Sequence, residues 1–274
     1  MEKILNYING ELTPPHSGEY IDNYDPSTGK VYSLIADSDK NDINNAVASA
    51  KEAFKTWSRT TKEERSNILI KIADTLEKYT NDLIIAESKD NGKPESLAAK
   101  VDLPRASTNL RFFASAILHD SSDMHEMDGA AINYTLRQPI GVAACISAWN
   151  LPLYLLTWKI APAIASGNTV VAKPSEITPM TAYMFSKICI EAGLPKGVLN
   201  IVHGLGSKVG DPLTTHPDTP IISFTGGTAT GKHIASVTSP MFKKLSLELG
   251  GKNPNIVFAD ADFEQAVSLS LIHI

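Results

Sequence analysis

Polar side chains that could do chemistry follow short apolar runs in the second half of the chain. The first is Asn150, in the segment Ile146-Ser-Ala-Trp-Asn-Leu-Pro152. A neutral amide placed after a strand can stabilise an oxyanion that develops in a transition state. Asn is also common as a helix cap or turn former, and that interpretation stays open.

A second polar cluster follows the next apolar run, in Val171-Ala-Lys-Pro-Ser-Glu176. Lys173 provides a cation, and the Glu176 carboxylate can accept hydrogen bonds from a pair of ribose hydroxyls. Pro174 fixes the turn between them. A surface ion pair is the alternative interpretation.

Two glycine-rich turns each precede an expected helix. In His203-Gly-Leu-Gly-Ser-Lys-Val-Gly210, the last Gly comes one position too late for the G-x-G-x-x-G pattern, so the turn is a weak dinucleotide fingerprint. In Phe224-Thr-Gly-Gly-Thr-Ala-Thr-Gly231, Gly226, Gly227 and Thr228 would present amides and hydroxyls to a pyrophosphate. His233 follows Lys232 where a Walker A loop has Ser or Thr, which disfavours an ATPase.

The last candidate is Glu248, in Leu245-Ser-Leu-Glu-Leu-Gly-Gly-Lys-Asn-Pro254. Its leucine neighbours predict apolar surroundings, which raise the pKa of a carboxyl group towards the range useful for a general base. A solvated side chain on an edge strand is the alternative interpretation.

Alternating elements must position these residues. The expected strands span 142–147, 169–172, 198–202, 221–224 and 244–249, and the expected helices span 154–166, 178–192, 207–216 and 228–239. This alternation predicts an α/β fold with right-handed crossovers and a mostly parallel sheet flanked by helices. Ligands bind beyond the carboxyl ends of such strands, which is where the polar residues occur.

The first third of the chain predicts a strand-bearing arm followed by three helices. The first helix has an apolar face at helical spacing, the second begins at the capping box Thr61 to Glu64, and the third spans about 82–91 before Gly92. The acidic segment 120–128 is expected to be an exposed loop.

Composition limits the class of protein. The 274 residues carry 25 basic and 30 acidic side chains, for a formal charge of −5, and 43% are hydrophobic. This balance predicts a globular protein and disfavours nucleic acid as a partner. The start lacks a signal core, and the longest apolar stretch, 151–164, is too short for a bilayer, so we expect a cytoplasmic location and no membrane partner.

The cysteines do not suggest a reactive site. Cys145 and Cys189 both lie in apolar runs, which predicts buried, reduced thiols. Neither a C-x-x-C motif nor a Cys/His cluster occurs, so we expect no metal site.

Four ordered motifs together resemble the NAD(P)-dependent aldehyde dehydrogenase superfamily: Ala148-Trp-Asn-Leu-Pro, Ala172-Lys-Pro-Ser-Glu, Phe224-Thr-Gly and Leu247-Glu-Leu-Gly-Gly-Lys-Asn-Pro. The resemblance runs from near residue 7 to about 267. It implies a Rossmann-like cofactor domain and the oxidation of an aldehyde to a carboxylate. Within the superfamily, residues 109–114 and 150–163 resemble the 2-aminomuconic semialdehyde dehydrogenase branch of the kynurenine pathway.

The resemblance also implies residue roles. Asn150 would help to form the oxyanion hole, and Glu248 would activate the deacylating water. Lys173 and Glu176 would hold the adenosine ribose, and Glu176 favours NAD because a carboxylate repels a 2′-phosphate. The other residues expected at the cofactor are Ile146, Ser147, Trp149, Ser175, Gly206, Gly210, Phe224, Thr225, Gly226, Gly227, Thr228 and Leu249. Gly227 stands where the family commonly has Ser, which removes one hydroxyl.

Arg105 lies where relatives that use neutral aldehydes tend to have an apolar residue. We hypothesise that it binds a substrate carboxylate, which muconic semialdehydes possess. A surface arginine is the alternative.

One departure from the family concerns the nucleophile, a Cys in a segment after Asn-Gln-Gly. The sequence ends at Ile274 before such a segment, and neither cysteine has a matching context. We therefore expect an N-terminal fragment, inactive alone, of a homo-oligomeric parent enzyme. The expected parts are an NAD-binding domain (1–118 and 140–250), an oligomerisation β-arm (119–139) and the start of a truncated catalytic domain (251–274).

The last six residues, 269–274, can be back-translated to a transposon-end adapter used in sequencing libraries. We expect them to be foreign to the gene. Two alternatives to a piece of an enzyme stay open: a non-catalytic dinucleotide-binding module and a non-functional fragment.

Overall fold

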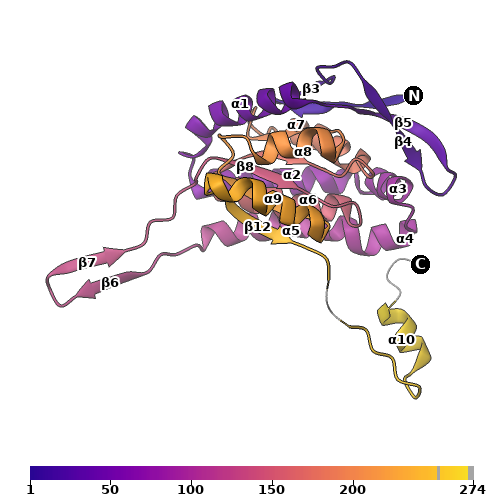
Figure 1. Ribbon diagram of the computed structural model, residues 1–274. Coiled ribbons are helices and arrows are strands. Elements are labelled where there is room, and N and C mark those ends of the chain that lie inside the picture. Colours follow the sequence, from indigo (N-terminus) through magenta and orange to yellow (C-terminus); the bar gives the residue numbers. More distant parts are fainter. Residues whose placement is uncertain (252–253, 271–274) are drawn as a thin grey trace.

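A parallel sheet forms the centre of the molecule (Figure 1). The computed structural model describes residues 1–251 and 254–270. In this part of the chain the main sheet contains β2 (Asn6–Ile8), β3 (Glu11–Thr13), β8 (Val142–Ile146), β9 (Thr169–Lys173), β10 (Leu199–Ile201), β11 (Ile221–Thr225) and β12 (Lys244–Glu248). The strand order is β12-β11-β8-β9-β10-β2-β3, with β8 to β12 parallel and β2 and β3 antiparallel. The predicted α/β fold is confirmed.

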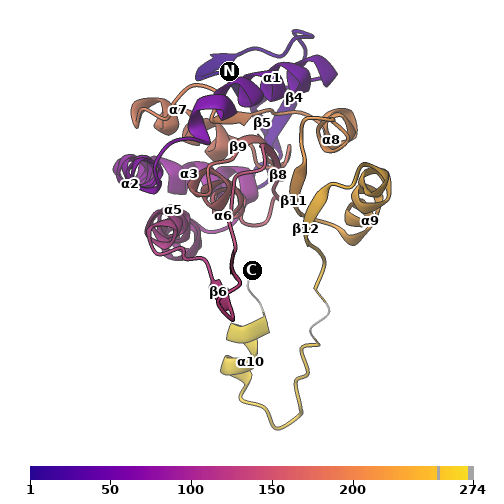
Figure 2. The ribbon, with the colours of Figure 1, turned by 90° about the vertical axis from the view of Figure 1, so that its left-hand side faces the viewer.

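Helices cover both faces of this sheet (Figure 2). One face packs against α1 (Lys40–Trp57), α8 (Gly206–Thr214) and α9 (Thr228–Thr238), and the other packs against α2 (Lys62–Lys78), α5 (Leu103–Leu118), α6 (Pro152–Ala165) and α7 (Met180–Glu191). Successive residues of β8 enter the two cores alternately, with Ala144 on the first face and Cys145 on the second. This two-sided burial explains why the strands are apolar throughout.

The strand order reverses between β8 and β11. From β8 the chain proceeds outward to β9 and β10, and then returns to the other side of β8 for β11 and β12. The register aligns the carboxyl ends of four strands, because Ile146 pairs with both Lys173 and Phe224, and Thr225 pairs with Glu248. Two crossovers diverge at such a point and leave a crevice between them.

The N-terminal third adds a second sheet and more helices. Strands β1 (Glu2–Ile4), β5 (Lys30–Ala36) and β4 (Tyr20–Asp25) form a three-stranded sheet in that order. The predicted capping box of α2 is present, and α3 (Thr80–Asn91) ends at Gly92 in the left-handed conformation. Three further helical segments follow that the sequence patterns did not predict: α4 (Glu95–Leu97), the π-helix η1 (Ala98–Asp102) and α5.

A two-stranded arm projects from the body (Figure 1). It consists of β6 (Met124–Met127) and β7 (Ala131–Tyr134), which pair only with each other. The expected loop at 120–128 is thus exposed, as predicted, but residues 124–127 are a strand. The role of the arm in oligomerisation stays a prediction.

The chain leaves the sheet after β12. The last described elements are the short 3-10 helix η2 (Ser239–Met241), which precedes β12, and α10 (Phe263–Ser270), which lies away from the body in both views (Figures 1 and 2). Residues 271–274 of the segment expected to be foreign lie outside the described residues. Among the described helices, none combines the length and the apolar character needed to cross a membrane.

Candidate functional site

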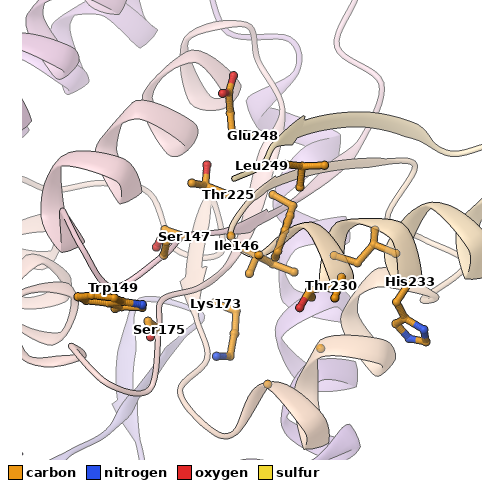
Figure 3. Close-up of a pocket in the computed structure, with 18 of the residues that line it drawn as sticks. Ile146, Ser147, Trp149, Lys173, Ser175, Thr225, Thr230, His233, Glu248 and Leu249 are labelled. Atoms are coloured by element: carbon orange, nitrogen blue, oxygen red, sulfur yellow. The ribbon is translucent and has the colours of Figure 1, made fainter. Parts of the chain in front are cut away.

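A cleft of about 1130 Å³ opens at the aligned carboxyl ends of β8, β9, β11 and β12. Trp149 and Ser147 lie at one end and His233 and Thr230 at the other, with Lys173 between them (Figure 3). The cleft brings together Asn150, Glu248 and thirteen of the fourteen expected cofactor residues, and Thr228 is the exception. Thr228 begins α9 but does not line the cleft, so its hydroxyl contact stays a prediction.

Lys173 and Glu176 form an ion pair in the middle of the cleft. The Lys173 ammonium donates to Oε2 of Glu176, and the backbone N–H of Gly206 donates to Oε1 of the same carboxylate at 3.1 Å. Burial lowers the pKa of Lys173, although Glu176 opposes the shift. Burial alone would raise the pKa of Glu176, but Lys173 and two backbone N–H groups outweigh it and hold this pKa below its usual value.

Two helices present their N-terminal ends to the cleft. Leu205, before α8, and Gly227, before α9, make no side-chain cap. The N–H of Gly206 in α8 already donates to Glu176, whereas the first N–H groups of α9 remain available to an acceptor. Such groups, with the positive end of the helix dipole, suit an anion. A Cβ at Gly226 would come within 2.5 Å of Cζ of Phe224, and a Cβ at Gly227 would meet nothing within 4 Å.

Two side chains at or just after the end of α3 donate hydrogen bonds to the backbone of Trp149 and Asn150. Asn91 Nδ2 donates to the carbonyl of Trp149 at 2.8 Å, and Lys93 Nζ donates to the carbonyl of Asn150 at 2.9 Å. Trp149 is half exposed, whereas Ser147 is buried with an Oγ that has no hydrogen-bond partner among the described residues. An orphaned hydroxyl at the end of β8 is available to a bound molecule.

Glu248 differs from the expectation. Its side chain is exposed at the end of the edge strand β12, so the apolar surroundings that the sequence predicted are absent in the described residues. The leucines on either side point to the other face of the strand, because side chains alternate across a sheet. Glu248 also lines a second cavity of about 340 Å³, with Phe113, Trp158 and Lys159. It therefore lies between the two spaces, and Figure 3 shows it turned away from Lys173.

Lys159 lines the second cavity and was not among the residues predicted for the site. Its Nζ donates to Oγ of Ser223 at 3.0 Å, and burial lowers its pKa. A lone lysine within an apolar stretch is the signal that could have identified it, since a buried lysine needs a partner.

Arg105 does not line the cleft. It is exposed, and its guanidinium carbon lies 5.6 Å from the centre of the Tyr154 ring. Edge-to-face ring contacts continue from Tyr154 to Trp158 and from Trp158 to Phe113, both of which line the second cavity. Arg105 thus stands at the outer end of an aromatic row that leads to that cavity.

The far end of the cleft includes residues that the sequence analysis did not single out. Asp211 on α8 and His233 on α9 approach each other across the cleft at 2.8 Å. They lie inside helices, where no strand end points to them. His203 is also near, but it is buried, and burial followed by the Lys173 charge lowers its pKa to about 3, so it is neutral.

The two thiols are buried, as predicted. Burial raises the pKa of Cys145 to about 12 and that of Cys189 further, so neither forms a thiolate near neutral pH. Within residues 1–251 and 254–270, no three His, Cys, Asp or Glu side chains gather as a metal site.

Comparisons with known proteins agree with this geometry. The model of the "Aldehyde dehydrogenase family" matches residues 12–273. The zebrafish (Danio rerio) 2-aminomuconic semialdehyde dehydrogenase is 54% identical over 97% of this chain and 54% of the relative. The 2-hydroxymuconic semialdehyde dehydrogenase of Pseudomonas sp. strain CF600 is 41% identical over 99% of this chain and 57% of the relative.

Among solved structures, an NAD⁺ complex of an aldehyde dehydrogenase from Bacillus cereus superposes with a TM-score of 0.93 at 37% identity, over 97% of this chain and 55% of that one. The chain spans about half the length of the relatives it matches. A family match over nearly the whole chain identifies it: the chain belongs to the aldehyde dehydrogenase family.

Proposed function

We propose that this chain is the cofactor-binding part of an NAD-dependent aldehyde dehydrogenase. The observation that carries the proposal is the cleft of about 1130 Å³ at the strand-order reversal, which contains the oriented Glu176 carboxylate and the N-terminal ends of α8 and α9. The complete protein would oxidise a muconic-type semialdehyde to a carboxylate. The relatives named for muconic semialdehydes support this substrate class.

The residues of the cleft fit a dinucleotide. Glu176, fixed by Lys173 and the Gly206 N–H, would accept hydrogen bonds from the adenosine ribose, and its charge would disfavour a 2′-phosphate. The amide of Gly227 would meet the pyrophosphate, since a Cβ at this position would meet nothing within 4 Å. The N–H of Gly226 instead donates to the carbonyl of Glu248 at 3.0 Å. Bound NAD supplies the hydride acceptor for the oxidation.

The chain's own catalytic groups would act at the other end of the cleft. The Asn150 amide would donate to the oxyanion formed when a thiolate attacks the aldehyde carbon. Glu248, exposed between the two cavities, would take a proton from the water that releases the acid. The thiolate would come from a residue outside this chain, because both thiols here are buried and protonated.

Arg105 is proposed as the group that selects a substrate carboxylate. Its position at the outer end of the aromatic row to the second cavity supports this role. In the complete enzyme, Arg105→Met should raise KM for a dicarboxylic semialdehyde about tenfold or more and leave KM for a simple aldehyde unchanged, since one charge-assisted contact is lost. An unchanged KM ratio between the two substrates would contradict the role.

The proposal extends to partners and location. The exposed arm β6–β7 supports a homo-oligomeric parent, because a two-stranded sheet with open outer edges and exposed apolar side chains can bind a second surface. Two buried, unlinked cysteines fit a reducing compartment, so we propose the cytoplasm.

An activity assay with NAD and a muconic semialdehyde tests the function. The longer protein encoded by the reading frame past Val267 should reduce NAD to NADH as it oxidises the aldehyde. Its Asn150→Ala variant should have a kcat about 10²–10³-fold lower, the order of magnitude for the loss of one oxyanion donor. NADH binding without any aldehyde oxidation by that longer protein would favour a non-catalytic dinucleotide-binding module instead.

A further inference from the structure

The turn after α3 contacts the loop that carries the proposed oxyanion amide. Asn91 and Lys93, two residues apart, donate to the two consecutive carbonyls of Trp149 and Asn150, at 2.8 and 2.9 Å. We propose that Asn91 and Lys93 are positioning residues which fix the Trp149–Asn150 loop over the cleft. The role of this loop in the reaction rests on the proposed function. The contacts that Asn91 and Lys93 make with the loop, called the brace below, do not depend on that function.

A third residue completes the brace. Lys93 Nζ also donates to Oδ1 of Asp102 at 2.8 Å, and the exposed fractions of the two side chains are 3% and 0%. Asp102 is the last residue of the π-helix η1. Such helices carry one extra residue per turn and occur frequently at functional sites. The irregular helix therefore presents a carboxylate to the lysine that holds the Asn150 carbonyl.

The neighbouring Glu87 does not compete with Asp102 for the Lys93 ammonium. Glu87 of α3 is fully buried, and burial, followed by the Asp102 charge, raises its pKa to about 8. At neutral pH Glu87 is protonated. Lys93 thus donates hydrogen bonds to Asp102 and to the Asn150 carbonyl, and its ammonium group has three hydrogens, enough for both.

The turn itself is constrained. Gly92 has φ +80°, which favours glycine, and a Cβ there would come within 3.0 Å of Cγ of Pro26. Ser88 Oγ donates to the carbonyl of Lys93 at 2.6 Å, which ties the turn back to α3. A donor on a fixed turn holds its acceptor in one place, because little side-chain freedom remains to be lost.

A stability role alone does not account for this arrangement. A buried ion pair is often no more stabilising than apolar residues of similar volume, because taking both charges out of water is costly. An apolar pair, however, could not donate to the Asn150 carbonyl. Removing both charges together therefore separates the two roles: stability should be largely kept, while the loop should lose its donor.

The test uses the 274-residue chain with the apolar pair Lys93→Met and Asp102→Val combined, and Asn91→Ala as a milder second variant. Backbone ¹⁵N order parameters of Trp149 to Leu151 report the loop, and NADH titration reports the cleft. We expect the order parameters to fall from about 0.85 to below about 0.6. We expect the Kd of NADH to rise about tenfold, the loss for one buried hydrogen bond. The melting temperature should stay close to that of the wild type.

The matched control combines Lys196→Met with Glu11→Gln, which removes a surface ion pair of 2.8 Å with both side chains 65% exposed. It should match the wild type in both readouts. Order parameters that stay at the wild-type value in the brace variant would overturn the proposal, as would a loosened loop with unchanged Kd. A wild-type chain that does not bind NADH would refute the proposed function, while the order parameters would still decide the brace.

Discussion

The charged residues of the cleft are stabilised and oriented by their neighbours. Lys173 is almost fully buried, and its charge is tolerated because Glu176 accepts from it directly. Glu176 in turn is held by the N–H of Gly206, so one carboxylate is oriented from two elements, β9 and α8. A carboxylate oriented before a ligand arrives loses little freedom on binding, which favours affinity.

Glu176→Gln should weaken NADH binding and improve the relative binding of NADPH. The amide removes the charge that repels a 2′-phosphate and accepts from the ribose less strongly, so we expect the Kd of NADH to rise about tenfold. Fluorescence titrations with both nucleotides measure this. Exposed Glu52, paired with Lys55 at the surface, gives a matched Glu→Gln control. An unchanged ratio of the two Kd values would argue against a ribose-binding role.

Gly227→Ser should strengthen binding. Gly227 precedes α9 with φ −65° and ψ 145°, and a Cβ there meets nothing within 4 Å, so Ser fits without strain. Its hydroxyl would cap α9 at about the stability of Gly, since the two differ by a few tenths of a kcal/mol at this position. It would also face the pyrophosphate, so the Kd of NADH should fall about threefold, within the range for a hydrogen bond. Weaker binding in a calorimetric titration would place the phosphates elsewhere.

At the scale of elements, local patterns predicted the chain well between residues 141 and 249. The expected strand 169–172 and helix 228–239 match β9 and α9 to within one residue, because strand composition and glycine turns are local signals. The sequence did not predict contacts between distant segments. Lys93 and Asn150 are 57 positions apart, and the π-helix that places Asp102 has no local signature. The exposure of Glu248 was predicted wrongly, since residues that flank it in sequence do not surround it in space.

Helix α3 carries a carboxyl group that couples stability to pH. Burial raises the pKa of Glu87 from 4.5 to about 8, so the folded chain keeps a proton that the unfolded chain releases at neutral pH. This contribution is complete below pH 4.5 and is lost as pH rises towards 8. Between pH 6 and 8, Glu87→Gln should therefore lose less stability than the wild type, by about 1.4 kcal/mol per pH unit at most.

Urea unfolding at several pH values measures this difference. Glu19→Gln, at an exposed position, serves as the control and should follow the wild type. Parallel pH curves for Glu87→Gln and the wild type would show that Glu87 is ionised in the folded protein.

In the whole molecule, the arm β6–β7 and residues 254–270, which include α10, lie outside the body (Figure 1). Their apolar side chains are exposed, with 64% of Ile132 and 72% of Phe258 accessible. Exposed apolar surface of this kind favours association.

The arm should mediate self-association of this chain. Combining Ile132→Glu with Tyr134→Glu places two charges on β7, where Tyr134 is 61% exposed, so the fold should not change. Light scattering after size exclusion should give a multiple of 29.6 kDa for the wild type and about 29.6 kDa for the variant. The same mass for both proteins would exclude the arm as the interface.

The proposed function depends on NAD binding in the cleft between α8 and α9, and a titration of the 274-residue chain with NADH measures that binding. We expect a saturable change in NADH fluorescence with one site per chain, with the nucleotide displaced by NAD⁺ and its binding weakened by Glu176→Gln. A folded chain that shows no saturable binding, or that binds NADH equally well after Glu176→Gln, would contradict it.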